Sequence, residues 1–76
     1  MDYTQKRDVF LSYETMALGG NLTDVLNVLR MHLNPEVVDD AESAVHEANR
    51  PHDALKVVLE LIDRARTEYY SATEEN

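Results

Sequence analysis

Asp39, Glu42 and His46 are the residues whose types and spacing come nearest to a metal-binding or catalytic pattern. They are three and four residues apart, so they would share one face of a helix. Carboxylates and imidazoles are common metal ligands, but a metal site in a helical bundle takes its ligands from several helices, usually with paired Glu-x-x-His motifs. The sequence contains neither that motif nor His-Glu-x-x-His. We therefore expect no metal and no cofactor.

The sequence also lacks a group of residues suited to covalent or acid–base catalysis. There is no cysteine, and no serine stands in a Gly-x-Ser-x-Gly motif. His32, His46 and His52 are the only side chains expected to titrate near neutral pH, and we expect them to be ordinary surface histidines. Gly19-Gly20 is not part of a phosphate-binding motif. We expect a protein that is not an enzyme.

Acidic residues are concentrated in one part of the chain. Asp and Glu number 15 against 7 Lys and Arg, which gives a formal net charge of −8, and five of the acids fall within residues 34–50. An acidic helix face attracts a basic patch on another protein, such as a signalling or nucleoid protein. The predicted partner-binding residues are Glu36, Asp39, Asp40, Glu42 and Glu47.

The same acidic face admits other interpretations. The carboxylates could serve only to keep the helix solvated, or they could imitate the phosphates of a nucleic acid, as in an inhibitor encoded by a phage or mobile element. A helical DNA-binding regulator is a further alternative. Direct nucleic-acid binding is disfavoured because it needs a basic surface that releases counterions.

Length and composition limit the architecture. The 76 residues suffice for one small domain, residues 1–76, and the lack of cysteine excludes a disulfide scaffold. No run of 18 apolar residues exists, and residues 1–8 lack the apolar core of a signal peptide. We therefore expect a cytoplasmic protein with no membrane contact.

Apolar residues recur with a helical period and never with the alternation of a strand, which predicts an all-α bundle of three or four helices. The expected helices are residues 4–18, 22–33, 35–50 and 51–70, followed by a frayed tail at 71–76. Asn34 with Pro35 is a typical helix start. Asn21 is a second candidate N-cap, with Asp24 in a position like that of a capping box.

The glycine pair Gly19-Gly20 leaves the first boundary open. Two glycines are a good helix stop, but the apolar pattern keeps its helical phase through them, from Leu11 to Leu29. The first two segments therefore form either two helices or one long helix that is kinked at the glycines.

The last helix carries more apolar surface than its neighbours can cover. One stripe is predicted to form a core or dimer face, and it consists of Leu55, Val58, Leu59, Ile62 and Tyr69. A second stripe consists of Ala54, Val57, Leu61 and Ala65. A helix that is apolar on more than half of its surface is central or has a second partner, and a small helical domain is only marginally stable alone. We expect a homodimer.

The aromatic residues cluster near the two chain ends. They are Tyr3, Phe10, Tyr13, Tyr69 and Tyr70. Antiparallel first and last helices would bring them together, and core or interface packing is the expected role.

The order of these segments resembles a known family. Glu14-Thr15-Met16-Ala17-Leu18-Gly19 precedes the aliphatic helix that begins at Leu22, and the last helix reads Asp53-Ala54-Leu55-Lys56-Val57-Val58-Leu59-Glu60-Leu61-Ile62. Over roughly residues 10–65 this is similar to the small enterobacterial biofilm-development and acid-resistance regulators of the YmgB/AriR type. The resemblance implies a three-helix fold with a long first helix, a homodimer, and a regulatory stress-response role as a connector to two-component signalling. It implies no functional residue, because the matching positions are structural.

Overall fold

The chain forms four α-helices, which a computed structural model describes over residues 9–74, with side chains through residue 71. The helices are α1 (Val9–Leu18), α2 (Leu22–Leu29), α3 (Pro35–Glu47) and α4 (Pro51–Glu74). No strand occurs in the described part of the chain, so the all-α bundle is confirmed. No helix in residues 9–74 has the length and apolarity needed to cross a bilayer. The start predicted for the first helix, at residue 4, lies outside the described residues.

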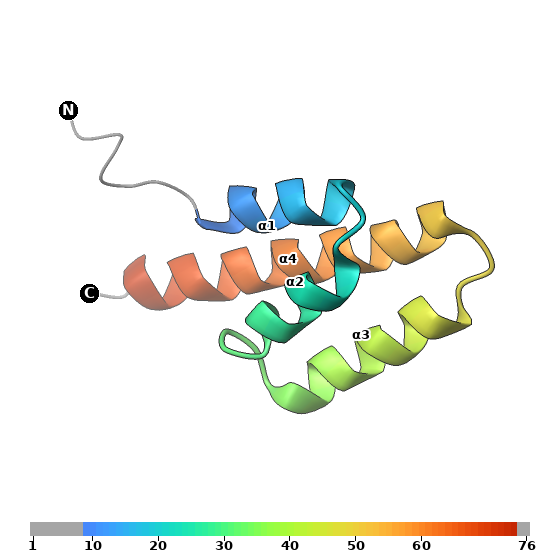
Figure 1. The fold of residues 1–76 in the computed structure, drawn as a ribbon. Coiled ribbons are helices and arrows are strands. Elements are labelled where there is room, and N and C mark those ends of the chain that lie inside the picture. The colour runs from blue at the N-terminus through green and yellow to red at the C-terminus, as the bar shows by residue number, and fades with distance from the viewer. Residues whose placement is uncertain (1–8, 75–76) are drawn as a thin grey trace.

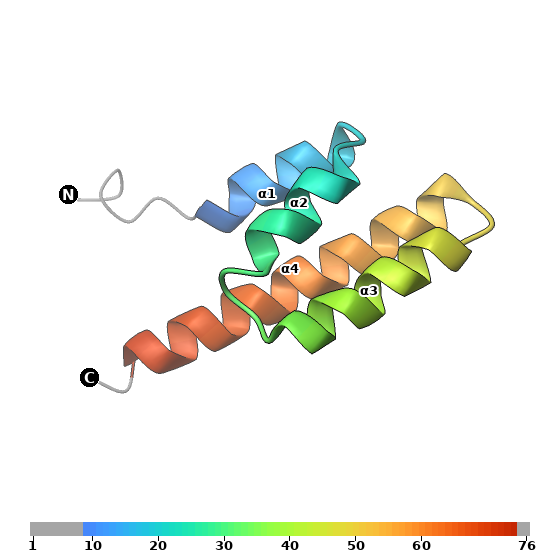
Figure 2. The same cartoon turned by 60° about the horizontal axis from the view of Figure 1, so that its bottom comes forward.

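The long helix α4 is the centre of the arrangement. Helices α1 and α3 run antiparallel to it on opposite sides, and α2 lies across it between them (Figures 1 and 2). The core is formed where the four helices meet. It consists of Phe10, Ala17, Val25, Leu26, Leu29, Leu33, Val38, Val58, Leu61, Ile62 and Ala65. Residues on α4 supply four of these positions, as expected for a central helix.

The glycine pair ends α1, so the two-helix alternative is correct. Gly20 has φ +95°, a conformation that side-chain-bearing residues avoid. Its N–H donates to Ala17 O at 3.0 Å, and the Asn21 N–H donates to Met16 O at 3.0 Å. These two bonds form a Schellman motif, which satisfies carbonyls at the end of the helix. The chain then reverses direction into α2.

Gly20→Ala is expected to destabilise the chain by about 1–2 kcal/mol, because a Cβ atom is unfavourable at positive φ. Gly19→Ala is the matched control. A Cβ at Gly19 would lie 3.5 Å from Thr15 O, an ordinary contact. Urea unfolding followed by circular dichroism measures both. Equal losses of stability in the two variants would contradict the assigned turn.

Helix α2 is shorter than predicted. It ends at Leu29, and residues 30–33 form a tight turn in which His32 N–H donates to Leu29 O at 2.9 Å. Asn34 is extended, with ψ 131°, as the residue before a proline prefers, and it separates this turn from α3. Leu33 is nevertheless buried, as the apolar stripe predicts.

The two predicted N-caps differ. The Asn34 side chain accepts a hydrogen bond of 2.8 Å from the Glu36 N–H, which confirms the start of α3. Asn21 precedes α2, but its side chain makes no capping hydrogen bond, so the capping box predicted with Asp24 is wrong. The Schellman turn explains the difference, because it fixes the backbone of Asn21 at φ −90° and ψ 56°.

Helix α3 ends at Glu47, three residues before the predicted limit, because Ala48 is already extended. Helix α4 is longer than predicted and continues through residues 71–74, which were expected to be frayed. Its 24 residues correspond to a length of about 36 Å. This length lets α4 contact each of the other three helices.

Candidate functional site

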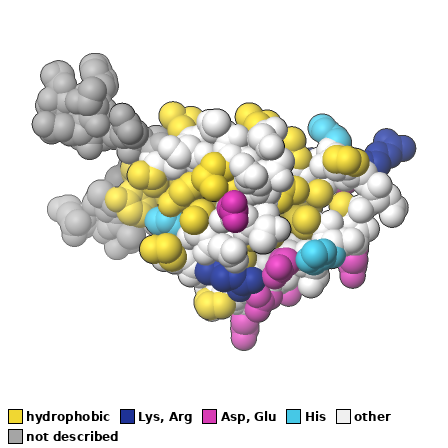
Figure 3. Space-filling model, viewed as in Figure 1, with side chains coloured by type: hydrophobic (Ala, Val, Ile, Leu, Met, Phe, Trp, Pro, Cys, Tyr) yellow, Lys and Arg dark blue, Asp and Glu magenta, His cyan; other side chains and the backbone are white. Residues whose placement is uncertain are grey.

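The five predicted acidic residues all lie on α3 and reach its surface. Figure 3 shows acidic side chains gathered along the edge of the molecule formed by α3. Glu36, Asp39, Asp40 and Glu47 are exposed, and Glu42 is partly buried. Glu36 and Glu47 mark the two ends of the helix. The five predicted residues therefore lie on the surface of one helix but differ in their exposure.

Arg30 forms ion pairs with two of these five acids. Its Nη1 lies 2.6 Å from Asp39 Oδ1, and its Nη2 lies 3.0 Å from Glu42 Oε1. The hydrogen bond that Arg30 donates to Asp39 raises the pKa of Arg30, desolvation opposes this shift, and the charges of Asp39 and Glu42 add to it. Asp39 and Glu42 thus link the end of α2 to α3, and Arg30 compensates one of their two negative charges.

Sequence reasoning missed Arg30, although a signal was present. It is the only Lys or Arg between residues 8 and 49, and it directly precedes the acidic segment. A lone cation at the end of one helix is a natural partner for acids at the start of the next.

The possible metal ligands are not assembled into a site. Asp39 and Glu42 face Arg30, and His46 Nε2 lies 4.0 Å from Glu42 Oε2. Among the side chains that the structure describes, no group of three His, Asp or Glu residues could hold a metal ion.

Asp40 lies beside a groove between α3 and α4, which we call the α3/α4 groove. Its volume is about 450 Å³, and it is lined by Val37, Asp40, Ala41, Val57, Glu60, Leu61 and Arg64. Four of these residues are apolar, whereas Asp40 stands on the α3 side and Glu60 on the α4 side. Arg64 is engaged by Glu68, with 3.3 Å between Nε and Oε2. The groove therefore combines an apolar lining with an acid on each side.

The predicted core or dimer stripe of α4 divides into two groups. Val58 and Ile62 are completely buried inside the single chain, where a second protein cannot contact them. Leu55 and Leu59 are partly buried and line a separate surface groove. Tyr69 is 50% exposed.

The aromatic residues meet as predicted. Phe10 is fully buried and packs edge-on against Tyr13 at 5.6 Å and Tyr69 at 5.7 Å between ring centroids, with Tyr70 at 6.4 Å. Tyr3 lies outside the described residues. The cluster joins the start of α1 to the end of α4.

His32 belongs to the same cluster, which sequence reasoning did not anticipate. Its ring centroid lies 5.2 Å from that of Phe10, and its Nε2 lies 3.3 Å from the Tyr13 hydroxyl oxygen. His46 and His52, in contrast, are exposed as expected. The turn after α2 carries His32 inward, a placement that a continuous helix to residue 33 would not predict.

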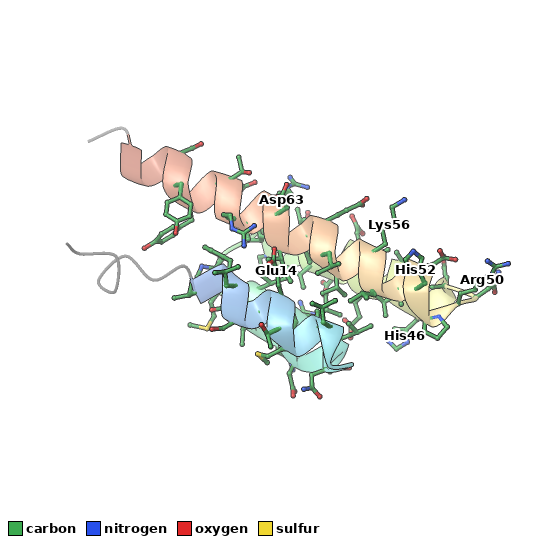
Figure 4. The ribbon with its side chains drawn as sticks, turned by 90° about the horizontal axis from the view of Figure 1, so that it is seen from above. Glu14, His46, Arg50, His52, Lys56 and Asp63 are labelled. Carbon is green, nitrogen blue, oxygen red and sulfur yellow. The ribbon has the colours of Figure 1, made fainter. Side chains whose placement is uncertain are left out.

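Glu14 and Arg66 join α1 to α4 beside the aromatic cluster. Arg66 Nη2 lies 3.1 Å from Glu14 Oε2, and the guanidinium carbon lies 5.9 Å from the centroid of the Phe10 ring. Figure 4 shows Glu14 on the side of α1 that faces α4. This pair fixes the relative position of the two helices along the surface that they share.

Comparison with known proteins adds no relative, since no family model, curated protein or solved structure matches the chain. The resemblance to the YmgB/AriR-type regulators thus stays a hypothesis that depends on the residues quoted above. Any functional argument for this chain has to come from its own surfaces.

Proposed function

We propose that the chain is a small non-enzymatic regulatory adaptor that binds a basic surface of a partner protein in the α3/α4 groove. The observation that carries this proposal is the pairing of an apolar lining with Asp40 and Glu60. Within the described residues, neither of these two carboxylates has an ion-pair partner, unlike Asp39 and Glu42. The acids at the groove therefore remain available to another molecule.

The groove favours a partner with a particular combination of groups. Apolar side chains would be buried against Val37 and Leu61, while a Lys or Arg on each side would approach Asp40 and Glu60. The exposed Glu36 would extend the acidic field along α3. Charge would speed the encounter, and burial of apolar groups would hold the complex.

The cellular role is part of the same proposal. A cytoplasmic location, a homodimer and a regulatory task in biofilm or stress responses agree with the composition and with the YmgB/AriR resemblance. A signalling or nucleoid protein with a basic patch is the partner that fits the groove. Nothing in the proposal requires a metal, a cofactor or a membrane.

Asp40→Lys is expected to weaken partner binding at least about tenfold, because it places a cation beside a basic ligand. Asp24→Lys is the matched control, since it makes the same charge change at an exposed α2 position away from the groove. The tagged chain and both variants would be used to recover partners from the native host at low and high salt, with identification by mass spectrometry. Helical content by circular dichroism would establish that each variant folds.

The proposal predicts a basic signalling or nucleoid protein that the wild type and Asp24→Lys retain, that Asp40→Lys loses, and that high salt releases. Equal recovery by both variants would contradict the role of the groove. Recovery of a nuclease or polymerase would instead support the nucleic-acid mimic. If only the chain itself is recovered, the acids serve solvation.

A further inference from the structure

A second surface lies on α4 next to the α3/α4 groove, and Glu60 lines both. Two grooves of about 470 and 320 Å³ adjoin there, because both are lined by His52 and Leu55. Leu59 lines the first and Leu18 the second. We call this the α1/α4 surface, and it consists of Leu18, His52, Leu55, Lys56, Leu59, Glu60 and Asp63.

The leucines on this surface are only partly covered in the single chain. Leu18 is 66% exposed, and Leu11, two turns earlier on α1, is 56% exposed. Leu55 and Leu59 contact the core on one side and the grooves on the other. Leu18 and the open sides of Leu55 and Leu59 line adjoining grooves, and an apolar area of this kind marks an association site.

The occupant has to be compatible with the charges beside the leucines. Along α4 the surface carries His52 and Lys56 first, and Glu60 and Asp63 about two turns later. Figure 4 shows Lys56 and Asp63 at separate points along α4, with Lys56 nearer the end of the helix that holds His52. A partner whose charges are all of one sign would be attracted at one end of this surface and repelled at the other.

A second copy of the chain can present an opposite charge to each end of this surface. Lys56 and Asp63 are seven residues apart, so they lie about 10 Å apart along the same side of α4. If a two-fold axis passes near Leu59, the α4 helices run antiparallel, and Lys56 of each copy opposes Asp63 of the other. The two copies of Leu59 then lie between the two pairs and Leu55 lies just outside them, which gives the self-complementary contact of a symmetric dimer.

The charged side chains are available for this pairing. Lys56 is exposed and has no ion-pair partner among the described residues. Asp63 Oδ1 lies 3.7 Å from Arg66 Nη1, but the shorter contact of Arg66 is with Glu14, and the Asp63 side chain stays 74% exposed. Two local attractions also oppose the general repulsion between chains of net charge −8.

We infer that two copies of the chain pair through the α1/α4 surface, with α4 antiparallel to α4 and with reciprocal Lys56–Asp63 contacts. The leucines and the order of charges along α4 support this dimer face, whatever the α3/α4 groove binds. If the proposed function also holds, the Asp40 side of the groove stays open on both copies, because Asp40 lies outside the α1/α4 surface, whereas Glu60 lines both surfaces. Each dimer would then present two partner-binding grooves.

A charge exchange tests this arrangement. Sedimentation equilibrium of the full chain is expected to show a dimer that Lys56→Glu and Asp63→Lys each weaken at least about tenfold, through repulsion of like charges. The double variant Lys56→Glu/Asp63→Lys is expected to recover dimerisation, because the opposite charges again face each other. Arg50→Glu is the matched control, since Arg50 is exposed and lines neither groove.

The outcomes separate this inference from the proposed function. A wild-type chain that stays monomeric at millimolar concentration, or a double variant no stronger than the single ones, would overturn it. An effect of Arg50→Glu equal to that of Lys56→Glu would also overturn it, because general charge would then explain the loss. None of these measurements includes a partner protein, so they do not test the proposed function. The Asp40→Lys variant, which does test it, lies outside the α1/α4 surface.

Discussion

Phe10→Ala is expected to remove a large part of the stability of the folded chain. Phe10 is completely buried and is surrounded by the rings of Tyr13, His32 and Tyr69, with the Arg66 guanidinium 5.9 Å from its centroid. Truncation of a buried phenylalanine costs about 3–5 kcal/mol. A chain of 76 residues has a total stability of only about 4–11 kcal/mol. Urea unfolding followed by far-ultraviolet circular dichroism measures the loss.

Two substitutions serve as controls for this result. Phe10→Leu keeps an apolar side chain in the buried space and should cost less than Phe10→Ala. Val9→Ala changes a neighbouring side chain that is 45% exposed, so its effect should be smaller still. If Phe10→Ala unfolded at the same urea concentration as Val9→Ala, the aromatic cluster would not hold α1 against α4.

Ile62→Ala is the second change with a large expected effect. The Ile62 side chain is fully buried between the helices, and its truncation should destabilise the chain by about 2–5 kcal/mol. In a domain of this size each kcal/mol lowers the melting temperature by about 4–8 °C. Thermal unfolding would therefore show a large downward shift.

Leu59→Ala provides the informative contrast, because Leu59 is only partly buried and lines the α1/α4 surface. We expect a smaller loss of stability from Leu59→Ala, measured at a concentration where the chain is monomeric, and a greater loss of self-association. Equal thermal shifts in the two variants would mean that Leu59 is a core residue. In that case the α1/α4 surface would lose its central contact.

The helices could be predicted because local signals and the apolar period agree. Asn34 with Pro35 fixed the start of α3 through a side-chain cap, and Gly20 supplied the positive φ that ends α1. The end of α2 could not be predicted in the same way. Leu33 continues the apolar stripe, but it is buried by the turn at residues 30–33 and not by a continued helix, and no glycine or proline within that turn announces it.

The candidate site was only partly predictable for a similar reason. Sequence spacing places Asp39, Asp40 and Glu42 on one helix but does not say which of them meets a cation from elsewhere. Arg30 forms ion pairs with Asp39 and Glu42 but not with Asp40. The opposite acid of the groove, Glu60, comes from α4 and was absent from the predicted set. Contacts between separate helices depend on tertiary packing, which spacing along one helix does not reveal.

The aromatic cluster also gives the chain a built-in spectroscopic reporter. The sequence has no tryptophan, and three of its four tyrosines, Tyr13, Tyr69 and Tyr70, lie in or beside the contact between α1 and α4. The near-ultraviolet circular dichroism of these rings depends on fixed asymmetric packing, whereas the far-ultraviolet signal depends on helix content. Loosening of α1 from α4 without loss of helix would therefore be visible as a change in the tyrosine band alone, with no added label.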